Sequence, residues 1–100
     1  MKNQSGKAGE EHIARWLESQ GYEILARNFH SRYGEIDIVA QRPPYIAFVE
    51  VKARVENSLV SPFEAITPRK QRKIIATAQE YLRQHPSGLQ PRFDAAAVHL

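Results

Sequence analysis

Apolar residues follow two different spacings along the chain, and the spacings alternate in the order helix, three strands, helix, strand. From Gly9 to Gln20 and from Thr67 to Gln84, apolar positions recur every three to four residues, as on one side of an amphipathic helix. Period-two alternation with β-branched and aromatic residues, typical of strands, occurs in the runs 22–29, 34–40, 45–54 and 92–100. This order predicts an α/β fold with one mixed sheet.

The connections between these elements predict how the strands pair. HSRY followed by Gly34 and QRPP at 41–44 are short, turn-like connections, so the first three strands form an antiparallel meander. Thr67 and Pro68 suit the N-cap and first position of the second helix. That helix is a crossover, and it places the last strand parallel to the third through a right-handed connection.

The QRPP turn also predicts a register. If it is centred on Pro43 and Pro44, residues whose numbers sum to 87 face each other, and Asp37 lies opposite Glu50. By the same rule Glu35 lies opposite Lys52. One face of the hairpin then carries these four charged side chains, and the apolar layer behind it comprises Ile36, Ile38, Val49 and Val51.

We expect one domain at this length of 100 residues. Residues 1–8 are polar and lack periodicity, so they are predicted to be a flexible lead-in to a single domain over 9–100. The last strand-like run stops at Leu100 without a closing signal. We therefore expect that a natural C-terminal piece is missing.

Composition excludes several kinds of site. With no cysteine, the chain has no disulfide, no thiolate zinc site and no cysteine nucleophile. Its four histidines lack the spacing of a helical metal pair, so any metal is held mainly by oxygen, which favours Mg²⁺ or Mn²⁺. No apolar run has the length of a signal peptide or membrane span, so we expect a cytoplasmic protein without membrane contact. The net charge of +3 is compatible with a polyanionic partner.

The charged face of the hairpin has two interpretations. Three carboxylates and an amine close together repel one another unless a cation intervenes, and a divalent ion would relieve that repulsion. Such an ion polarises a phosphate and acidifies a bound water, and Lys52 would then orient the water or stabilise the pentacovalent phosphorus. The alternative is an exposed strand face with an ion pair worth less than about 1 kcal/mol.

Several strings in the chain together resemble a known nuclease-like family. GxxGEE at 6–11, GYEILARN at 21–28, GEIDIVA at 34–40, FVEVKAR at 48–54, TPRKQRKI at 67–74 and RFD at 92–94 resemble the bacterial YraN family. That family belongs with the PD-(D/E)XK nucleases and is related to archaeal-type Holliday junction resolvases. The resemblance implies a restriction-endonuclease-like fold, which agrees with the elements predicted above.

The resemblance also implies roles for individual residues. Asp37 and Glu50 match the metal-binding acids, and Lys52 matches the catalytic lysine. Glu10 matches a helical carboxylate that related resolvases place beside the site, although an acid near a helix start is also an ordinary dipole partner. The backbone carbonyl of Val51 would be a further metal ligand.

Two positions fit the superfamily pattern less directly. Glu35 belongs to the GEID string rather than to the superfamily core, and we expect a supporting role in which it accepts a hydrogen bond or pairs with Lys52. The superfamily's nominal proline before the aspartate is replaced by Ile36.

Basic residues gather at the start of the second helix. Arg69, Lys70, Arg72 and Lys73 oppose the helix dipole, and they either bind nucleic-acid phosphates or form a solvated face. Lys70 is the member that the family string contains. Arg54, on the same predicted face as Lys52, would extend this phosphate contact.

Aromatic residues divide into two predicted groups. Core positions are assigned to Trp16, Tyr22, Phe48, Tyr81 and Phe93. Tyr33 and Phe29, next to a turn, are better placed to contact a nucleobase.

The hypothesis that follows is a Mg²⁺- or Mn²⁺-dependent endonuclease that hydrolyses branched or single-stranded DNA. A junction resolvase makes two symmetry-related cuts, so this activity would require a homodimer. The alternative is a nucleic-acid-binding module of the same fold that does not cut. A third hypothesis is a scaffold that binds another DNA-processing factor through the basic helix.

Overall fold

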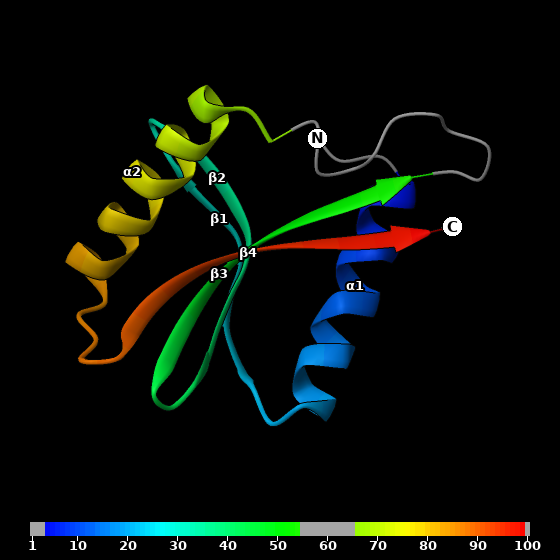
Figure 1. Ribbon diagram of the computed structural model, residues 1–100, viewed down its shortest axis with the longest axis horizontal. Helices are drawn as coiled ribbons and strands as arrows, with labels where there is room; N and C mark the ends of the chain where they lie inside the picture. Colours follow the sequence, from blue (N-terminus) through cyan, green and yellow to red (C-terminus); the bar gives the residue numbers. More distant parts are fainter. Residues whose placement is uncertain (1–3, 55–65, 100) are drawn as a thin grey trace.

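The computed structural model describes residues 4–54 and 66–99 (Figure 1). The elements in chain order are α1 (Gln4–Ser19), β1 (Glu23–Ser31), β2 (Gly34–Arg42), β3 (Tyr45–Arg54), α2 (Pro68–Gln84) and β4 (Gln90–His99). This is the predicted order of helix, three strands, helix and strand, and the α/β fold class is confirmed.

The four strands form one mixed sheet in the order β1-β2-β3-β4. β1, β2 and β3 are antiparallel neighbours, and β4 runs parallel to β3, as predicted. The predicted register of the second hairpin is confirmed from Arg42 with Tyr45 to Ile38 with Val49, where all pairs sum to 87, and the predicted pair of Asp37 with Glu50 lies beyond the last described pair. The Pro43–Pro44 peptide in the turn is cis.

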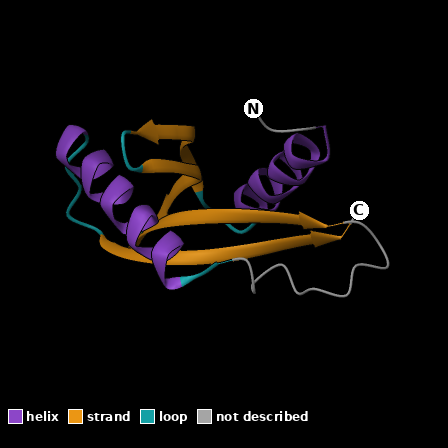
Figure 2. Ribbon diagram, turned by 90° about the horizontal axis from the view of Figure 1, so that it is seen from above, coloured by secondary structure: helices purple, strands orange, loops and turns teal. Residues whose placement is uncertain are grey.

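The two helices cover opposite faces of the sheet, and Figure 2 shows them well separated on either side of the strands. On one face, Ile13, Ala14 and Leu17 of α1 pack against a cluster that includes Val49. On the other face, Ala78 and Tyr81 of α2 pack against a second cluster that includes Ile36, Val39, Ile46 and Phe48. Each helix therefore buries one apolar stripe, as the three- to four-residue spacing predicted.

The start of α2 is fixed by its own sequence. Thr67 is the N-cap, and its side-chain oxygen accepts a hydrogen bond from the Lys70 backbone N–H at 3.2 Å. Pro68 follows at the first helical position, where a missing N–H costs nothing. Farther along, the ring of Tyr81 makes edge contacts with Phe29 and Phe48. These contacts anchor the C-terminal part of α2 to the sheet.

Four expectations about the helices and aromatic residues are wrong. α1 begins at Gln4 rather than Gly9. The prediction missed this start because the first turns carry polar residues and glycines that show no apolar periodicity. Trp16 is 54% exposed although its position fits the spacing of the buried stripe. Phe93 is 47% exposed because β4 is at the edge of the sheet. Phe29 is the reverse case: it packs against the α2 cluster and is not free to stack on a base.

Strict alternation along β2 breaks near Asp37. Ile36 packs in the α2 cluster, whereas Ile38 packs in the α1 cluster, although two residues apart on a regular strand share one face. The predicted common layer of Ile36, Ile38, Val49 and Val51 is therefore wrong at Ile36. The described pairs between β2 and β3 also stop at Ile38 with Val49. The regular pairing of the two strands thus ends next to Asp37.

Neither helix in residues 4–54 and 66–99 has the length and hydropathy needed to cross a lipid bilayer.

Candidate functional site

Asp37 lies at the point where β2 and β3 separate. Its side chain is only 2% exposed, and its Oδ2 accepts a hydrogen bond from the Val51 backbone N–H at 2.7 Å. The carboxylate thus takes the place of a backbone acceptor in the ladder. In an extended strand the N–H and C=O of one residue point to the same side. The Val51 carbonyl is therefore directed toward the side of β3 on which Asp37 lies.

Glu50 and Lys52 lie on either side of Val51. The Lys52 Nζ and the Glu50 Oε1 are 3.0 Å apart, and both side chains are largely buried. On β4 their register partners are Ala95 and Ala97, small residues that leave room beside the ion pair. The pair is thus more buried than the alternative of an exposed strand face predicted.

Burial and charge shift the pKa of both residues. Burial raises the pKa of Glu50 above its ordinary value, and the nearby charge of Asp37 raises it further, while Lys52 acts in the opposite direction. Burial lowers the pKa of Lys52, but hydrogen bonds to Lys70 and Glu50 outweigh burial and leave this pKa raised. Lys52 therefore keeps its proton, whereas burial and the charge of Asp37 favour the protonated form of Glu50 more than Lys52 favours the ionised form.

Lys70 is the basic residue that the structure brings to this cluster. Its side chain extends from the first turn of α2 to the Lys52 amine, and this contact lowers the pKa of Lys70. Arg69, Arg72 and Lys73 are exposed. The side chain of Arg54 lies outside the described residues.

Glu10 lies beneath β1 and is 2% exposed. Its Oε1 accepts a hydrogen bond from Asn28 Nδ2 at 2.8 Å and lies 3.7 Å from an Arg27 guanidinium nitrogen. Because Arg27 pairs with Ile38 and Phe29 with Ile36, Asn28 lies opposite Asp37. Glu10 thus approaches the site through Asn28. The interpretation of Glu10 as a partner of the helix dipole is weakened, since α1 begins at Gln4 and Glu10 lies beyond its first turn.

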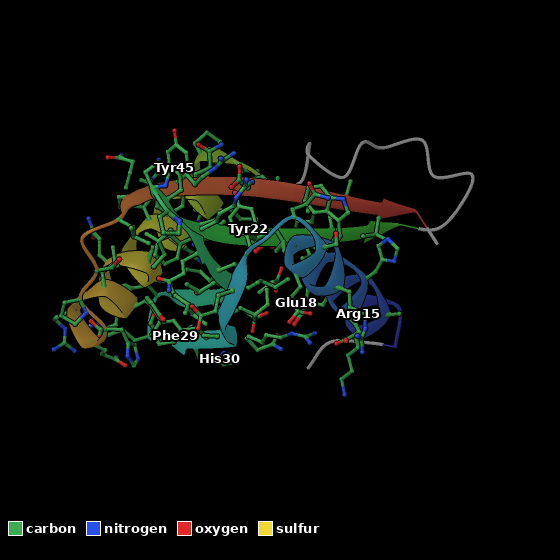
Figure 3. All side chains as sticks on the ribbon, turned by 90° about the horizontal axis from the view of Figure 1, so that it is seen from below. Arg15, Glu18, Tyr22, Phe29, His30 and Tyr45 are labelled. Carbon is green, nitrogen blue, oxygen red and sulfur yellow. The ribbon has the colours of Figure 1, made fainter. Side chains whose placement is uncertain are left out.

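Glu35 does not lie where the register predicted. It pairs with His30 of β1, with the His30 Nε2 and Glu35 Oε2 3.4 Å apart. Figure 3 labels His30 beside Phe29 on β1. The prediction extended the β2–β3 ladder past Ile38, where the described pairs stop. The expected pairing of Glu35 with Lys52 is therefore wrong.

Asn28, the hydrogen-bond partner of Glu10, is a residue that the sequence did not reveal. It adopts a left-handed backbone conformation, with φ 53°, inside β1. Asparagine tolerates this conformation better than most residues. An asparagine within an otherwise strand-like run was the available signal, but nothing in the sequence linked it to Glu10.

Residues 9–98 match the model of a family described as Uncharacterised protein family UPF0102. The chain belongs to the UPF0102 family. This is the YraN family that the motifs indicated.

Individual UPF0102 proteins cover most of the chain. One from Rhodopseudomonas palustris (strain ATCC BAA-98 / CGA009) is 47% identical over 96 residues, 94% of this chain and 72% of the relative. Another, from Chlorobium chlorochromatii, is 43% identical over 95 residues, 95% of this chain and 74% of the relative. A third, from Syntrophomonas wolfei, is 46% identical over 86 residues, 86% of this chain and 75% of the relative.

Asp37, Glu50 and the Val51 carbonyl are the groups of this UPF0102 chain that could hold a magnesium ion with few protein ligands. Within the described ranges, no three Asp, Glu or His residues are close enough together to hold a metal. Mg²⁺ needs only one or two carboxylates, because it retains several waters and takes oxygen ligands from substrate phosphates. Asp37 and Glu50 supply two carboxylates, and the Val51 carbonyl is directed to the same side of β3.

Proposed function

We propose that this UPF0102 protein is a Mg²⁺- or Mn²⁺-dependent endonuclease that hydrolyses phosphodiester bonds in DNA. One observation carries the proposal: a largely buried Glu50–Lys52 pair lies beside the buried carboxylate of Asp37, where two strands separate. A buried acid with a raised pKa, close to a second acid and an amine, is a typical arrangement for catalysis.

The residues divide between metal ligation and charge stabilisation. Asp37, Glu50 and the Val51 carbonyl would hold the ion, which when bound would polarise a phosphate and acidify a water. Lys52 would position the attacking water and stabilise charge on the phosphorus, since its ammonium is largely buried and stays protonated. Glu10 would support the site through Asn28, which lies opposite Asp37.

Substrate phosphates would be held by the start of α2. Lys70 reaches the site directly, and Arg69, Arg72 and Lys73 continue the positive charge along the exposed surface of the helix. We propose a branched or single-stranded DNA substrate in the cytoplasm. A homodimer would be needed if the substrate is a junction that must be cut twice.

The test is cleavage of single-stranded, branched and duplex DNA by the wild-type protein with Mg²⁺ or Mn²⁺. Asp37→Asn and Lys52→Met each remove one charge with little change in volume, and both should abolish cleavage. Glu18→Gln, an exposed acid on α1, is the matched control and should cleave like the wild type. If Asp37→Asn gives the same products at the same rate as the wild type, the proposed active site is wrong.

A non-catalytic nucleic-acid-binding module of the same fold is the second candidate. The observation that favours it is the Glu50–Lys52 ion pair, which neutralises Glu50 without a metal. In that case DNA binding would be independent of divalent ions. Any cleavage seen in the assay would come from a contaminant and would be the same for the wild type and every variant. Affinity should still fall steeply with salt, because phosphate contacts release counterions. A scaffold that binds only another protein would lack this salt dependence.

A further inference from the structure

A groove begins at Glu50 and runs between α2 and the strands β3 and β4. It encloses about 360 Å³, and its lining includes Gln71, Ile74 and Ile75 of α2 and Phe93 of β4. This volume is within the range of small-ligand pockets, about 300–1,000 Å³. Glu50 also belongs to the candidate active site, so the groove and that site share this residue.

Phe93 gives the groove an aromatic wall. Its ring stacks on Phe48, with ring centroids 5.5 Å apart and planes tilted by 26°. Phe48 is buried, whereas Phe93 is 47% exposed, so the core supports one face of the Phe93 ring and part of the residue stays accessible. Across the groove, Ile75 is 43% exposed. A flat ring held against the core and facing an aliphatic side chain can accept another flat apolar surface.

We propose that this groove binds one unpaired nucleobase of a single-stranded or branched nucleic acid, stacked on Phe93. The inference rests on the proposed function for the location of the phosphates, because the same nucleotide would extend its phosphate toward Lys52 and Lys70. Lys70 precedes Gln71 in α2, so a phosphate contact and a base contact lie on successive residues of one helix turn.

The polar groups of the groove suit the edge of a base. The Gln71 Nε2 donates to the Ile66 carbonyl at 3.3 Å, which leaves its amide oxygen as an acceptor. Asp94 also lines the groove, and its carboxylate pairs with the Arg92 guanidinium at 2.9 Å. A base in a continuous duplex has both faces covered by its neighbours, and only an unpaired base presents a free face to Phe93. The groove therefore selects against intact duplex.

Binding without divalent metal tests the groove separately from cleavage. The probes are a fluorescein-labelled octathymidylate and a blunt hairpin duplex, titrated in the presence of a chelator. Phe93→Leu keeps an apolar side chain but removes the ring, and it should weaken single-strand binding about five- to tenfold with little effect on the duplex. Phe93→Tyr keeps the ring and should bind like the wild type. Trp16→Leu, at an exposed aromatic residue on α1, is the matched control.

A second measurement identifies the base as the occupant. An abasic site is placed at each position of the octathymidylate in turn, which keeps the phosphates and removes one base. At one position the loss in affinity should be about five- to tenfold for the wild type and near zero for Phe93→Leu. The two changes are then non-additive because they remove the same contact.

Three results would overturn the inference. Equal weakening of both probes by Phe93→Leu, or weakening of neither, would mean that no base stacks on Phe93. Additive effects at every abasic position would mean the same. A concentration-dependent dimer that Phe93→Leu dissociates would assign the groove to a second copy of the chain. If the wild type binds through the groove but cleaves no DNA, the proposed nuclease function fails while this inference stands.

Discussion

Replacing Asp37 separates its structural role from its proposed catalytic role. Its Oδ2 accepts the Val51 N–H in the interior, so the carboxylate joins β3 to β2 beyond their last described pair. Asp37→Ala removes the acceptor and the charge together, whereas Asp37→Asn keeps an oxygen in nearly the same place. Alanine should therefore weaken the fold and abolish cleavage, and asparagine should abolish cleavage alone.

The expected cost follows from the burial of both groups. A buried N–H without an acceptor costs about 1–3 kcal/mol, and hydrogen bonds to charged groups lie toward the upper end. We expect Asp37→Ala to lose about 2 kcal/mol of unfolding free energy, from a total of about 5–15 kcal/mol. For a domain of this size that is a fall of about 8–16 °C in Tm. Asp37→Asn should lose under about 1 kcal/mol, since it also relieves the repulsion that raises the pKa of Glu50.

Thermal unfolding followed by circular dichroism measures this difference, with Glu18→Gln as the control at an exposed acid. Cleavage is measured on the same preparations at a temperature where all variants are folded. Equal Tm values for Asp37→Ala and the wild type would show that the Val51 hydrogen bond contributes little. An asparagine variant as unstable as the alanine variant would show that the charge, rather than the acceptor, stabilises the strands.

Three further predictions concern the surroundings of the site. In metal-free protein the pKa of Glu50 is raised, so the folded state binds the Glu50 proton more tightly than the unfolded chain does. Protonated Glu50 therefore stabilises the fold, and this stabilisation is lost as pH rises from the ordinary pKa of 4.5 through the raised pKa. Chemical unfolding as a function of pH should thus show a smaller loss of stability over this window for Glu50→Gln than for the wild type; an equal loss would contradict the shift. Thr67→Ala removes the N-cap of α2 and should cost about 1 kcal/mol in chemical unfolding, whereas Thr67→Ser should cost much less. Lys70→Ala should weaken single-stranded DNA binding and reduce the slope of log affinity against log salt by about 0.7, and an unchanged slope would exclude a phosphate contact.

Much of the fold could be predicted because its determinants are local. The QRPP turn fixed the register of β2 and β3 over five pairs, and Thr67 with Pro68 marked the start of α2 to the residue. The crossover helix required β4 to run parallel to β3. In each case a short stretch of sequence determines the geometry through turn, cap or connection chemistry.

The errors occur where distant parts of the chain decide the outcome. A regular ladder would place Glu35 opposite Lys52, but the carboxylate of Asp37 bonds to the Val51 backbone, and Glu35 pairs with His30 instead. The alternation of side chains between the two faces of β2 also breaks near Asp37, and no local sequence pattern predicts this break.

Exposure of the aromatic residues was also beyond local reasoning. Phe93 has the alternation of a core strand residue, yet it is half-exposed because β4 has a neighbouring strand on one side only. Lys70 was singled out by its family string, but its contact with Lys52 depends on how α2 docks on the sheet. Such residues can be placed only when the packing of the elements is known.

The parallel pairing of β3 and β4 has a consequence for the order of folding. Every β3–β4 pair joins residues 45 positions apart, as Tyr45 with Gln90, whereas the β2–β3 pairs span 11 positions or fewer. Closing the longer loop costs more chain entropy, so we expect the meander to be structured in the transition state and β4 to dock afterwards. Substitutions at Ala95, opposite Glu50, should then accelerate unfolding more than they slow refolding. Glu50 would thus acquire its buried environment only as the last strand joins the sheet.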